Sequence, residues 1–419
     1  MPKFIIEGGH ELSGSISVSG AKNAALKIIP ASLLSEQTIT IKNLPKIEDI
    51  DRSLEIITDL GGLVLPTPDG CTINTKDLTK NIISSDLANK LRASIMFVGP
   101  LLARTGTASF PHPGGCVIGA GTRPIDLFLE GFVAMGADIK WKNGIYHLTA
   151  KKLKACQYFF TTVSVTGTES LMMTAVLAEG TSVLKNCALE PEIVALADYL
   201  NSQGARINGA GTPTMTIEGV EAIGAGEFTV MPDRIEAGTF AIMAATTNSP
   251  LTINNFRAEH LESLLAVLAK VGVKFELATN SLKIISADNL QAYSIKTHEY
   301  PGFPTDLQSP YTVLMTQAQG SSIVHETIYD RRLLFTDMLT QMGANIIMCD
   351  PHRVVVSGPT PLTGHKLTSP DLRAGISMVI AGLIAKGTTE IDNIYQIDRG
   401  YENIDERLRQ LGAKITRLV

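Results

Sequence analysis

Five charged residues stand at matching places in the chain, each at or near the start of a predicted apolar helix. Four are cations and one is an acid: Lys22, Arg92, Arg234, Arg373 and Asp306. The N-terminus of a helix carries about half a positive charge, so a cation is unfavourably placed there. Burying that cation without a partner costs several kcal/mol more. We therefore expect an anion with phosphate or carboxylate groups to complete the site, held between two lobes.

An internal ion pair is the alternative for each cation. Arg234 could pair with Asp233 or Glu236, and Arg373 could pair with Asp371. The recurrence of a cation at one place favours the ligand over this alternative. The sequence contains no Walker loop, no G-x-G-x-x-G after a strand and no H-E-x-x-H, so nucleotide-motor, dehydrogenase and metalloprotease functions lose support.

A glycine-rich loop carries a second candidate for chemistry. Residues 111–124 contain four glycines within eight positions, with Cys116 among them. A segment so poor in side-chain contacts suits a lid, and Arg123 could lower the pKa of the thiol. The alternative is a cysteine without a role. We expect Cys187 and Cys349, in or beside predicted strands, to be small core residues.

One pattern recurs six times along the chain: an amphipathic helix, a glycine and a short strand. The glycines are separated by 75, 68, 68, 71 and 69 residues and are Gly61, Gly136, Gly204, Gly272, Gly343 and Gly412. Each glycine would end its helix in the left-handed conformation, which glycine adopts without a steric penalty. Six units of about seventy residues therefore fill the chain.

Every unit also holds a second helix that is apolar on nearly every face, as expected of a helix buried within a domain. These helices are predicted near 23–35, 87–103, 169–178, 235–246, 307–318 and 372–385. Between the helices, short strands are predicted at 38–41, 182–184, 251–253 and 389–391. Such a unit predicts an α/β lobe with helices inside and sheets outside.

The expected fold class is α/β, a two-lobed inside-out α/β barrel built from six repeats of about 70 residues, three per lobe. A chain of 419 residues is large for one core, which favours two lobes over one closed ring or a solenoid. The glycine-rich stretch 225–231 is the expected boundary. The first strand, predicted at 3–6, could pair with either lobe.

The composition excludes other classes of function. The net charge of −5 and the aromatic content of 5% argue against a general nucleic-acid binder. The apolar runs are too short to span a membrane. Five cysteines without a C-x-x-C pair fit a reducing compartment. We expect a cytoplasmic protein that binds neither nucleic acid nor a membrane.

Five motifs, in order along the chain, carry a resemblance to a known family. They are residues 20–24, the Gly-Gly-Cys loop with 123–126, and residues 303–306, 371–374 and 397–402. Together they resemble the UDP-N-acetylglucosamine 1-carboxyvinyltransferases, enolpyruvyl transferases of the EPSP synthase family. The resemblance implies an N-terminal lobe of residues 22–230, which carries the Cys116 loop and the UDP-sugar side. It also implies a C-terminal lobe of residues 1–21 and 231–419.

The implied reaction transfers the enolpyruvyl group of phosphoenolpyruvate to the 3′-hydroxyl of UDP-N-acetylglucosamine and releases phosphate, the first committed step of peptidoglycan synthesis. By the resemblance, Cys116 would protonate C3 of the enol or trap it as a pyruvyl adduct, and Asp306 would be the base near the sugar hydroxyl. Lys22 and Arg399 complete the implied catalytic set. No cofactor and no metal are expected, and the protein is expected to act as a monomer on small-molecule substrates.

The resemblance also implies the substrate contacts. Phosphoenolpyruvate would be bound by Lys22, Asn23, Arg92, Arg123, Arg373 and Arg399. UDP-N-acetylglucosamine would contact Arg92, Arg123, Pro124, Ile125, Asp126, Leu127, Thr162, Val163, Ser164, Val165, Asp306, Ile328 and Arg332. The loop departs from the usual pattern, because Arg123 comes seven positions after Cys116 instead of five, with Gly121 and Thr122 as the extra pair.

Two alternatives remain open. A shikimate-type enolpyruvyl transferase would share the fold, the arginines and the base, although the Gly-Gly-Cys loop and the Ala-Lys-Asn start favour the amino-sugar enzyme. A non-catalytic six-repeat protein would bind the ligand without releasing phosphate.

Overall fold

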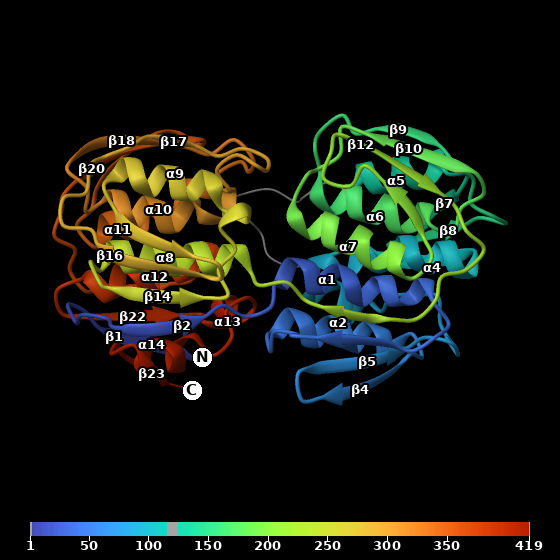
Figure 1. Ribbon diagram of the computed structural model, residues 1–419, viewed down its shortest axis with the longest axis horizontal. Helices are drawn as coiled ribbons and strands as arrows, with labels where there is room; N and C mark the ends of the chain where they lie inside the picture. Colours follow the sequence, from blue (N-terminus) through green and yellow to red (C-terminus); the bar gives the residue numbers. More distant parts are fainter. Residues whose placement is uncertain (1, 115–124, 419) are drawn as a thin grey trace. The chain divides into compact units, whose positions relative to one another are not determined.

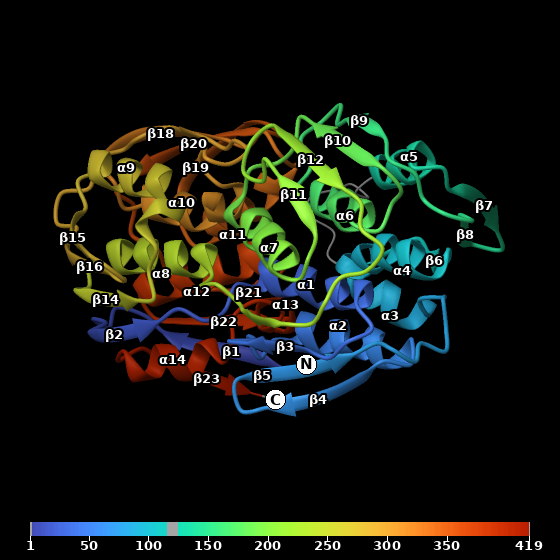
Figure 2. The same cartoon turned by 45° about the vertical axis from the view of Figure 1, so that its right-hand side comes forward.

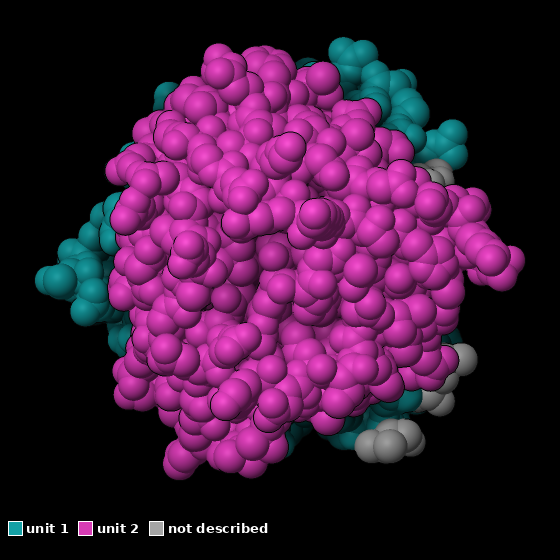
Figure 3. Space-filling model, turned by 90° about the vertical axis from the view of Figure 1, so that its right-hand side faces the viewer, with its two compact units in different colours: residues 1–19, 117–122, 232–419 teal, residues 20–116, 123–231 magenta. Residues whose placement is uncertain are grey.

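The structure, a computed structural model, describes residues 2–114 and 125–418 of the chain. The described residues divide into two compact units (Figure 1). Unit 1 contains residues 2–19 and 232–418, and unit 2 contains residues 20–114 and 125–231. Each unit has a hydrophobic core of its own. Figure 3 shows one face of unit 2 as a continuous packed surface.

Unit 2 surrounds buried helices with three sheets. Its α-helices are α1 (Lys22–Ala31), α2 (Glu48–Asp59), α3 (Ser85–Lys90), α4 (Val98–Thr105), α5 (Asp126–Ala134), α6 (Val165–Ala175) and α7 (Pro191–Ser202). Its short 3-10 helices are η1 (Ser32–Leu34) and η2 (Arg92–Phe97). The strands of the first sheet, in order, are β13 (Glu227–Thr229), β3 (Ile39–Lys42), β5 (Gly70–Asn74) and β4 (Leu63–Thr67). The second sheet has the strand order β6 (Thr107–Pro111), β8 (Ile145–Thr149), β7 (Asp138–Lys142). The third has the order β11 (Arg206–Asn208), β12 (Thr214–Glu218), β10 (Thr181–Lys185), β9 (Gln157–Phe159).

Unit 1 repeats this plan. Its α-helices are α8 (Arg234–Thr246), α9 (Glu262–Val271), α10 (Gln308–Met315), α11 (Thr336–Gln341), α12 (Leu372–Ile384), α13 (Tyr395–Asp398) and α14 (Ile404–Gln410). Its 3-10 helices are η3 (Ala258–His260), η4 (Thr305–Leu307) and η5 (Arg332–Phe335). One sheet is β15 (Lys274–Ala278), β16 (Ser281–Ser286), β14 (Leu251–Asn254), β2 (Gly14–Ser17). A second sheet has the order β17 (Ile295–Lys296), β18 (Gly320–His325), β20 (Arg353–Gly358), β19 (Asn345–Asp350). The third has the order β21 (Lys366–Thr368), β22 (Thr388–Asp392), β1 (Lys3–Glu7), β23 (Lys414–Leu418).

The inner helices of unit 1, α8, α10 and α12, contact one another, and nearly all of their side chains are buried. The outer helices are amphipathic and pack one face on the core, as α9 does through Leu264 and Leu268. The expected α/β class, with apolar helices inside each unit and sheets around them, is confirmed. Within the described residues, no helix combines the length and apolarity needed to cross a membrane.

The N-terminal strand completes the last sheet of the chain. Strand β1 lies between β22 and β23 and pairs antiparallel with both, so that Ile5 faces Glu390 on one side and Thr416 on the other. Figures 1 and 2 show the blue β1 beside these red strands. The first strand therefore belongs to unit 1, which the residues alone left open.

The six repeat glycines all adopt the left-handed conformation, with φ between 90° and 104°. Any other residue would carry a Cβ atom into a strained backbone there, so the prediction that these glycines end their helices is confirmed.

The predicted helix at 87–103 is wrong as one element. It is split into α3, η2 and α4, with Leu91 in an extended conformation. The Ala88 carbonyl, which a continuous helix would bond to the Arg92 N–H, accepts instead from the Gly114 N–H at 3.0 Å. Arg92 nevertheless begins a helical segment, η2.

A buried ion pair joins two inner helices of unit 2. The Nζ of Lys27 on α1 lies 3.2 Å from Oε2 of Glu169 on α6, and both side chains are almost fully buried. Burial, helped by the charges of Glu192 and Glu190 and opposed by the charge of Lys27, raises the pKa of Glu169 to about 7. Ionising Glu169 therefore costs stability as the pH rises from 4.5, its ordinary value, through about 7.

We expect Lys27→Met to destabilise the protein by about 3–5 kcal/mol, because it leaves a buried carboxylate without its cation. The double variant Lys27→Met/Glu169→Leu should recover this loss, since a packed apolar pair replaces two desolvated charges. Urea unfolding at pH 8 measures both. A double variant no more stable than Lys27→Met would contradict this account of the pair.

Candidate active site

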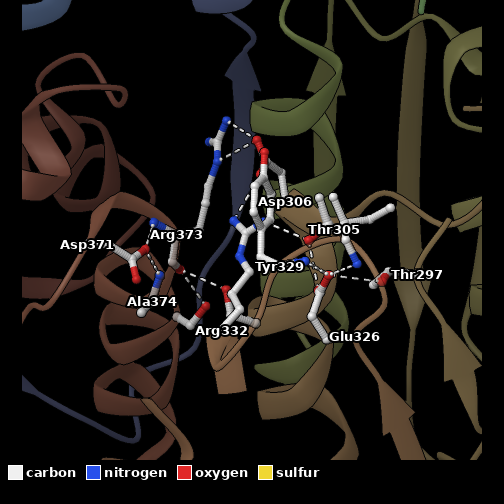
Figure 4. A network of polar contacts seen from close by, with 12 residues as sticks. Thr297, Thr305, Asp306, Glu326, Tyr329, Arg332, Asp371, Arg373 and Ala374 are labelled. Atoms are coloured by element: carbon white, nitrogen blue, oxygen red, sulfur yellow. Dashed lines mark hydrogen bonds and ion pairs between the residues drawn. The ribbon is translucent and has the colours of Figure 1, made fainter. Parts of the chain in front are cut away.

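Asp306 in unit 1 lies between two arginines. It is in η4, directly after Pro304 and Thr305. Its Oδ1 is 2.9 Å from Nη2 of Arg332, which begins η5, and its Oδ2 is 3.0 Å from Nη2 of Arg373, near the start of α12. Figure 4 shows the carboxylate facing both guanidinium groups. Both arginine side chains are buried, so the three groups form a compact charged centre.

The electrostatics of this centre hold Asp306 ionised. Burial raises the pKa of its carboxyl group, but the charges and hydrogen bonds of Arg373 and Arg332 outweigh burial and hold that pKa well below its ordinary range. Burial lowers the pKa of Arg373, but the charge of Asp306, together with smaller contributions from Tyr401 and Asp233, more than reverses this effect. A carboxylate in this state is a weak base, so its use in proton transfer requires that an arginine be drawn away.

A directed chain of hydrogen bonds leads from Arg373 into α8. Arg373 Nη1 donates to the Tyr401 hydroxyl at 3.1 Å, and that hydroxyl lies 2.9 Å from Thr239 Oγ1. Thr239 in turn donates to the Ile235 carbonyl at 2.8 Å. Because an arginine can only donate, the Tyr401 hydrogen must point to Thr239. The guanidinium of Arg373 is therefore held from two sides.

The aspartates suggested as ion-pair partners of Arg373 and Arg234 both act as helix N-caps. Asp371 accepts hydrogen bonds from the backbone N–H of Arg373 and Ala374, as an N-cap, and does not pair with the guanidinium. Asp233 caps α8 in the same way. An Asp or Asn side chain at this position typically stabilises a helix by about 1 kcal/mol.

Two further cations of unit 1, Arg234 and Arg399, contact an aromatic ring and an amide oxygen. The guanidinium of Arg234 lies over the ring of Tyr300, 5.6 Å from its centre, and Glu236 pairs with Arg407 instead. Arg399, at the C-terminal end of α13, is buried, and its Nη1 donates to Gln396 Oε1 at 3.1 Å.

Lys22 begins α1 in unit 2 and is paired. Its Nζ lies 2.7 Å from Oδ2 of Asp49 on α2, and Asn23 follows it in the first turn. The internal ion pair is therefore present for Lys22 as it is for Arg373, with a carboxylate that is distant in the sequence. An anionic ligand would have to compete with these carboxylates.

Arg92 of unit 2 lies beside a histidine that the sequence analysis did not single out. Arg92 Nη1 donates to the Pro113 carbonyl at 3.1 Å. Burial lowers the pKa of His112, the charge of Arg92 adds to this effect and Asp126 opposes it. The only sequence signal for His112 is its place between two prolines at the start of the glycine-rich loop.

The two segments expected on the nucleotide side lie at the starts of α5 and α6, two helices of unit 2 that contact each other. The Tyr158 hydroxyl on β9 donates to the Leu127 carbonyl at 3.2 Å, which joins β9 to the first turn of α5. Ile125 precedes α5, and Asp126 begins it. Ser164 caps α6 by accepting from the Gly167 N–H at 3.1 Å. Thr162 and Val163 precede this cap and Val165 begins the helix.

Three expected site residues, Cys116, Arg123 and Pro124, lie outside the described residues. Of the other cysteines, Cys187 is buried as expected, and burial raises the pKa of its thiol to about 11. The expectation for Cys349 is wrong, because it lies on the exposed side of β19. Among the described residues, no cluster of three or more His, Cys, Asp or Glu side chains could hold a metal ion.

Comparison with known proteins places the chain in a family. The sequence model described as EPSP synthase (3-phosphoshikimate 1-carboxyvinyltransferase) matches residues 6–408. The chain belongs to the EPSP synthase family. Two members named UDP-N-acetylglucosamine 1-carboxyvinyltransferase, from Desulfosudis oleivorans and Halothermothrix orenii, are 43% and 44% identical to the chain, each over 100% of both sequences.

Two solved structures share the fold of this chain. The enolpyruvyl transferase NikO from Streptomyces tendae superimposes with a TM-score of 0.90 at 23% identity, covering 99% of this chain and 98% of that one. EPSP synthase from Acinetobacter baumannii gives a TM-score of 0.74 at 18% identity, covering 100% of both chains. At these identities the likeness concerns the fold alone.

Proposed function

We propose that the protein transfers the enolpyruvyl group of phosphoenolpyruvate to the 3′-hydroxyl of UDP-N-acetylglucosamine and releases phosphate. The observation that carries this choice of acceptor is the full-length match, at 43% and 44% identity, to relatives of that name. The charged centre of Asp306, Arg332 and Arg373 supports it, because it offers a carboxylate for a hydroxyl proton and two guanidinium groups for anions.

The proposed reaction is an addition followed by an elimination. Cys116 donates a proton to C3 of phosphoenolpyruvate, which makes C2 electrophilic, and the sugar oxygen bonds to C2 while Asp306 accepts its proton. The Cys116 thiolate takes back a proton from C3 of the resulting ketal while the C2–O bond to phosphate breaks, and the proton held by Asp306 passes to the released phosphate. The products are the enol ether and phosphate, with both side chains restored. A thiol with an ordinary pKa near 8.5 is largely protonated at neutral pH and can act as this acid.

The geometry supports a coupling between substrate binding and the basicity of Asp306. An anionic group of phosphoenolpyruvate that draws Arg373 toward itself would weaken the ion pair that lowers the pKa of Asp306. Burial, which raises that pKa, would then act against less opposition. Asp306 would thus become an effective base only when the substrate is present.

The proposed substrate contacts of unit 2 are Lys22, Asn23 and Arg92 together with 125–127 and 162–165. Those of unit 1 are Asp306, Ile328, Arg332, Arg373 and Arg399. We propose that the two units are the expected lobes, 22–230 and 1–21 with 231–419. A role in peptidoglycan synthesis, a cytoplasmic location and action as a monomer belong to the same proposal.

Phosphate release from phosphoenolpyruvate tests the proposed function. We expect release with UDP-N-acetylglucosamine as the acceptor, and none without an acceptor or with shikimate 3-phosphate. Release with shikimate 3-phosphate but not with UDP-N-acetylglucosamine as the acceptor would assign the chain to the shikimate type. Ligand binding without phosphate release from any mixture would indicate the non-catalytic alternative.

A further inference from the structure

Glu326 is a buried carboxylate, directly after β18, that makes four hydrogen bonds to three separate segments of unit 1. Its Oε1 accepts from the Thr297 hydroxyl at 3.1 Å, from the Ile328 N–H at 2.8 Å and from the Tyr329 N–H at 3.1 Å. Its Oε2 accepts from the Thr305 hydroxyl at 2.8 Å. Figure 4 shows these contacts beside the Asp306 centre.

The direction of the bond between Thr305 and Glu326 is set by a third residue. Arg332 Nη1 lies 2.6 Å from Thr305 Oγ1, and an arginine can only donate. The Thr305 oxygen therefore accepts from Arg332, and its own hydrogen points to the Glu326 carboxylate. A continuous chain thus runs from Glu326 through Thr305 to Arg332 and then to Asp306, which Arg332 Nη2 contacts at 2.9 Å.

The charges along this chain alternate in sign. Burial lowers the pKa of Arg332, while Asp306 and then Glu326 raise it, with a net increase. Arg332 is therefore held between two carboxylates, one of which is the proposed base. Glu326 also binds the backbone of residue 328, an expected contact of the sugar.

We propose that Glu326 is a positioning residue with two functions, each served by one carboxylate oxygen. Through Thr305 it orients Arg332 against Asp306, and through the backbone of Ile328 and Tyr329 it holds the loop expected to contact the sugar. This inference rests on the proposed function, because it assigns Glu326 to the support of that reaction. Glu326 does not itself contact the reacting atoms in this assignment.

Glu326 has two sets of contacts, one branch through Thr305 to Arg332 and one branch to the backbone of Ile328 and Tyr329. Variants that interrupt one branch or both can separate the two functions. In Glu326→Gln, the amide oxygen can still accept from Thr297, Ile328 and Tyr329, but the amide nitrogen offers a donor to Thr305, which already accepts from Arg332. Thr305→Val removes the same link by deleting the hydroxyl. Glu326→Ala removes both branches.

We expect Glu326→Gln and Thr305→Val each to lower kcat by about 10–100-fold, as loss of an outer hydrogen-bond partner does at other sites. The KM for UDP-N-acetylglucosamine should change little in both. Glu326→Ala should lower kcat and also raise that KM. The double variant Glu326→Gln/Thr305→Val should be no worse than the poorer single variant, because both interrupt one chain. Thr305→Ser should recover most of the turnover lost in Thr305→Val.

The matched control is Thr246→Val, which removes a buried hydroxyl of α8 that donates to the Ile242 carbonyl of the same helix. Suppose that the wild type turns over UDP-N-acetylglucosamine and that Glu326→Gln and Thr305→Val both have the same kcat as this control. That result would overturn the inference and leave the proposed function intact. Additive losses in the double variant would also overturn it. A wild-type protein without this turnover would overturn the proposed function and the role of Glu326 with it.

Discussion

Replacing Asp306 by asparagine is expected to lower kcat by about 10²–10⁴-fold, the usual contribution of a positioned acid or base. The amide keeps the size of the side chain but cannot accept the hydroxyl proton. Because Asp306 is paired with both Arg332 and Arg373, the substitution also removes the negative charge that holds these guanidinium groups. Steady-state turnover with saturating substrates measures the first effect.

The same substitution should destabilise the protein by about 3–5 kcal/mol, since it leaves two buried cations without their shared carboxylate. It should also alter the pH dependence of stability. The folded-state pKa of Asp306 is depressed, so its contribution is present above its ordinary value of 3.8 and is lost as the pH falls below it. Urea unfolding between pH 3 and 7 should therefore show that the free energy of unfolding falls less steeply toward low pH in Asp306→Asn than in the wild type.

Asp350→Asn is the matched control for both measurements. It removes a carboxylate of unit 1 that lies 2.6 Å from Arg353 at the surface, where an ion pair contributes about 1 kcal/mol or less. We expect it to keep full turnover. If Asp306→Asn kept wild-type turnover as well, Asp306 would not be the base. The proposed coupling between substrate binding at Arg373 and the basicity of Asp306 would then have no role in the reaction.

Replacing Cys116 by alanine is expected to lower kcat by a similar factor of about 10²–10⁴, because no acid would then protonate C3. Cys116→Asp should retain turnover, since a carboxylic acid can donate the same proton. That variant should resist alkylation by the epoxide fosfomycin, which requires a thiol nucleophile. Mass spectrometry of the treated protein, together with turnover, measures both.

Cys349 provides the control within the same chain. Among the described cysteines it alone is exposed, so Cys349→Ala removes the most accessible of these thiols without altering the proposed acid. We expect Cys349→Ala to remain active and to react with fosfomycin. Alkylation of the wild type at Cys349, with Cys116 untouched, would exclude Cys116 as the reactive thiol.

The repeat and its helix ends were predictable because they depend on local interactions. Gly61 and the five glycines that follow it along the chain are required by the left-handed backbone at each helix end, a property of a few adjacent residues. The apolar inner helices were equally visible, because every face of such a helix is buried. The break at Leu91 was missed, since it depends on a bond from Gly114, 26 residues away from Ala88.

The sequence by itself determined the six-repeat organisation, the family and the types of residue available for catalysis. Only the tertiary structure decided which charges meet: Asp306 with Arg332 and Arg373, Lys22 with Asp49, and Glu326 with Thr305. An ion pair or hydrogen bond between residues distant in the chain leaves no periodic pattern, because its partners meet only when separate repeats pack together. Burial then makes these pairs strong enough to set the pKa of the proposed base, which residue type alone does not specify.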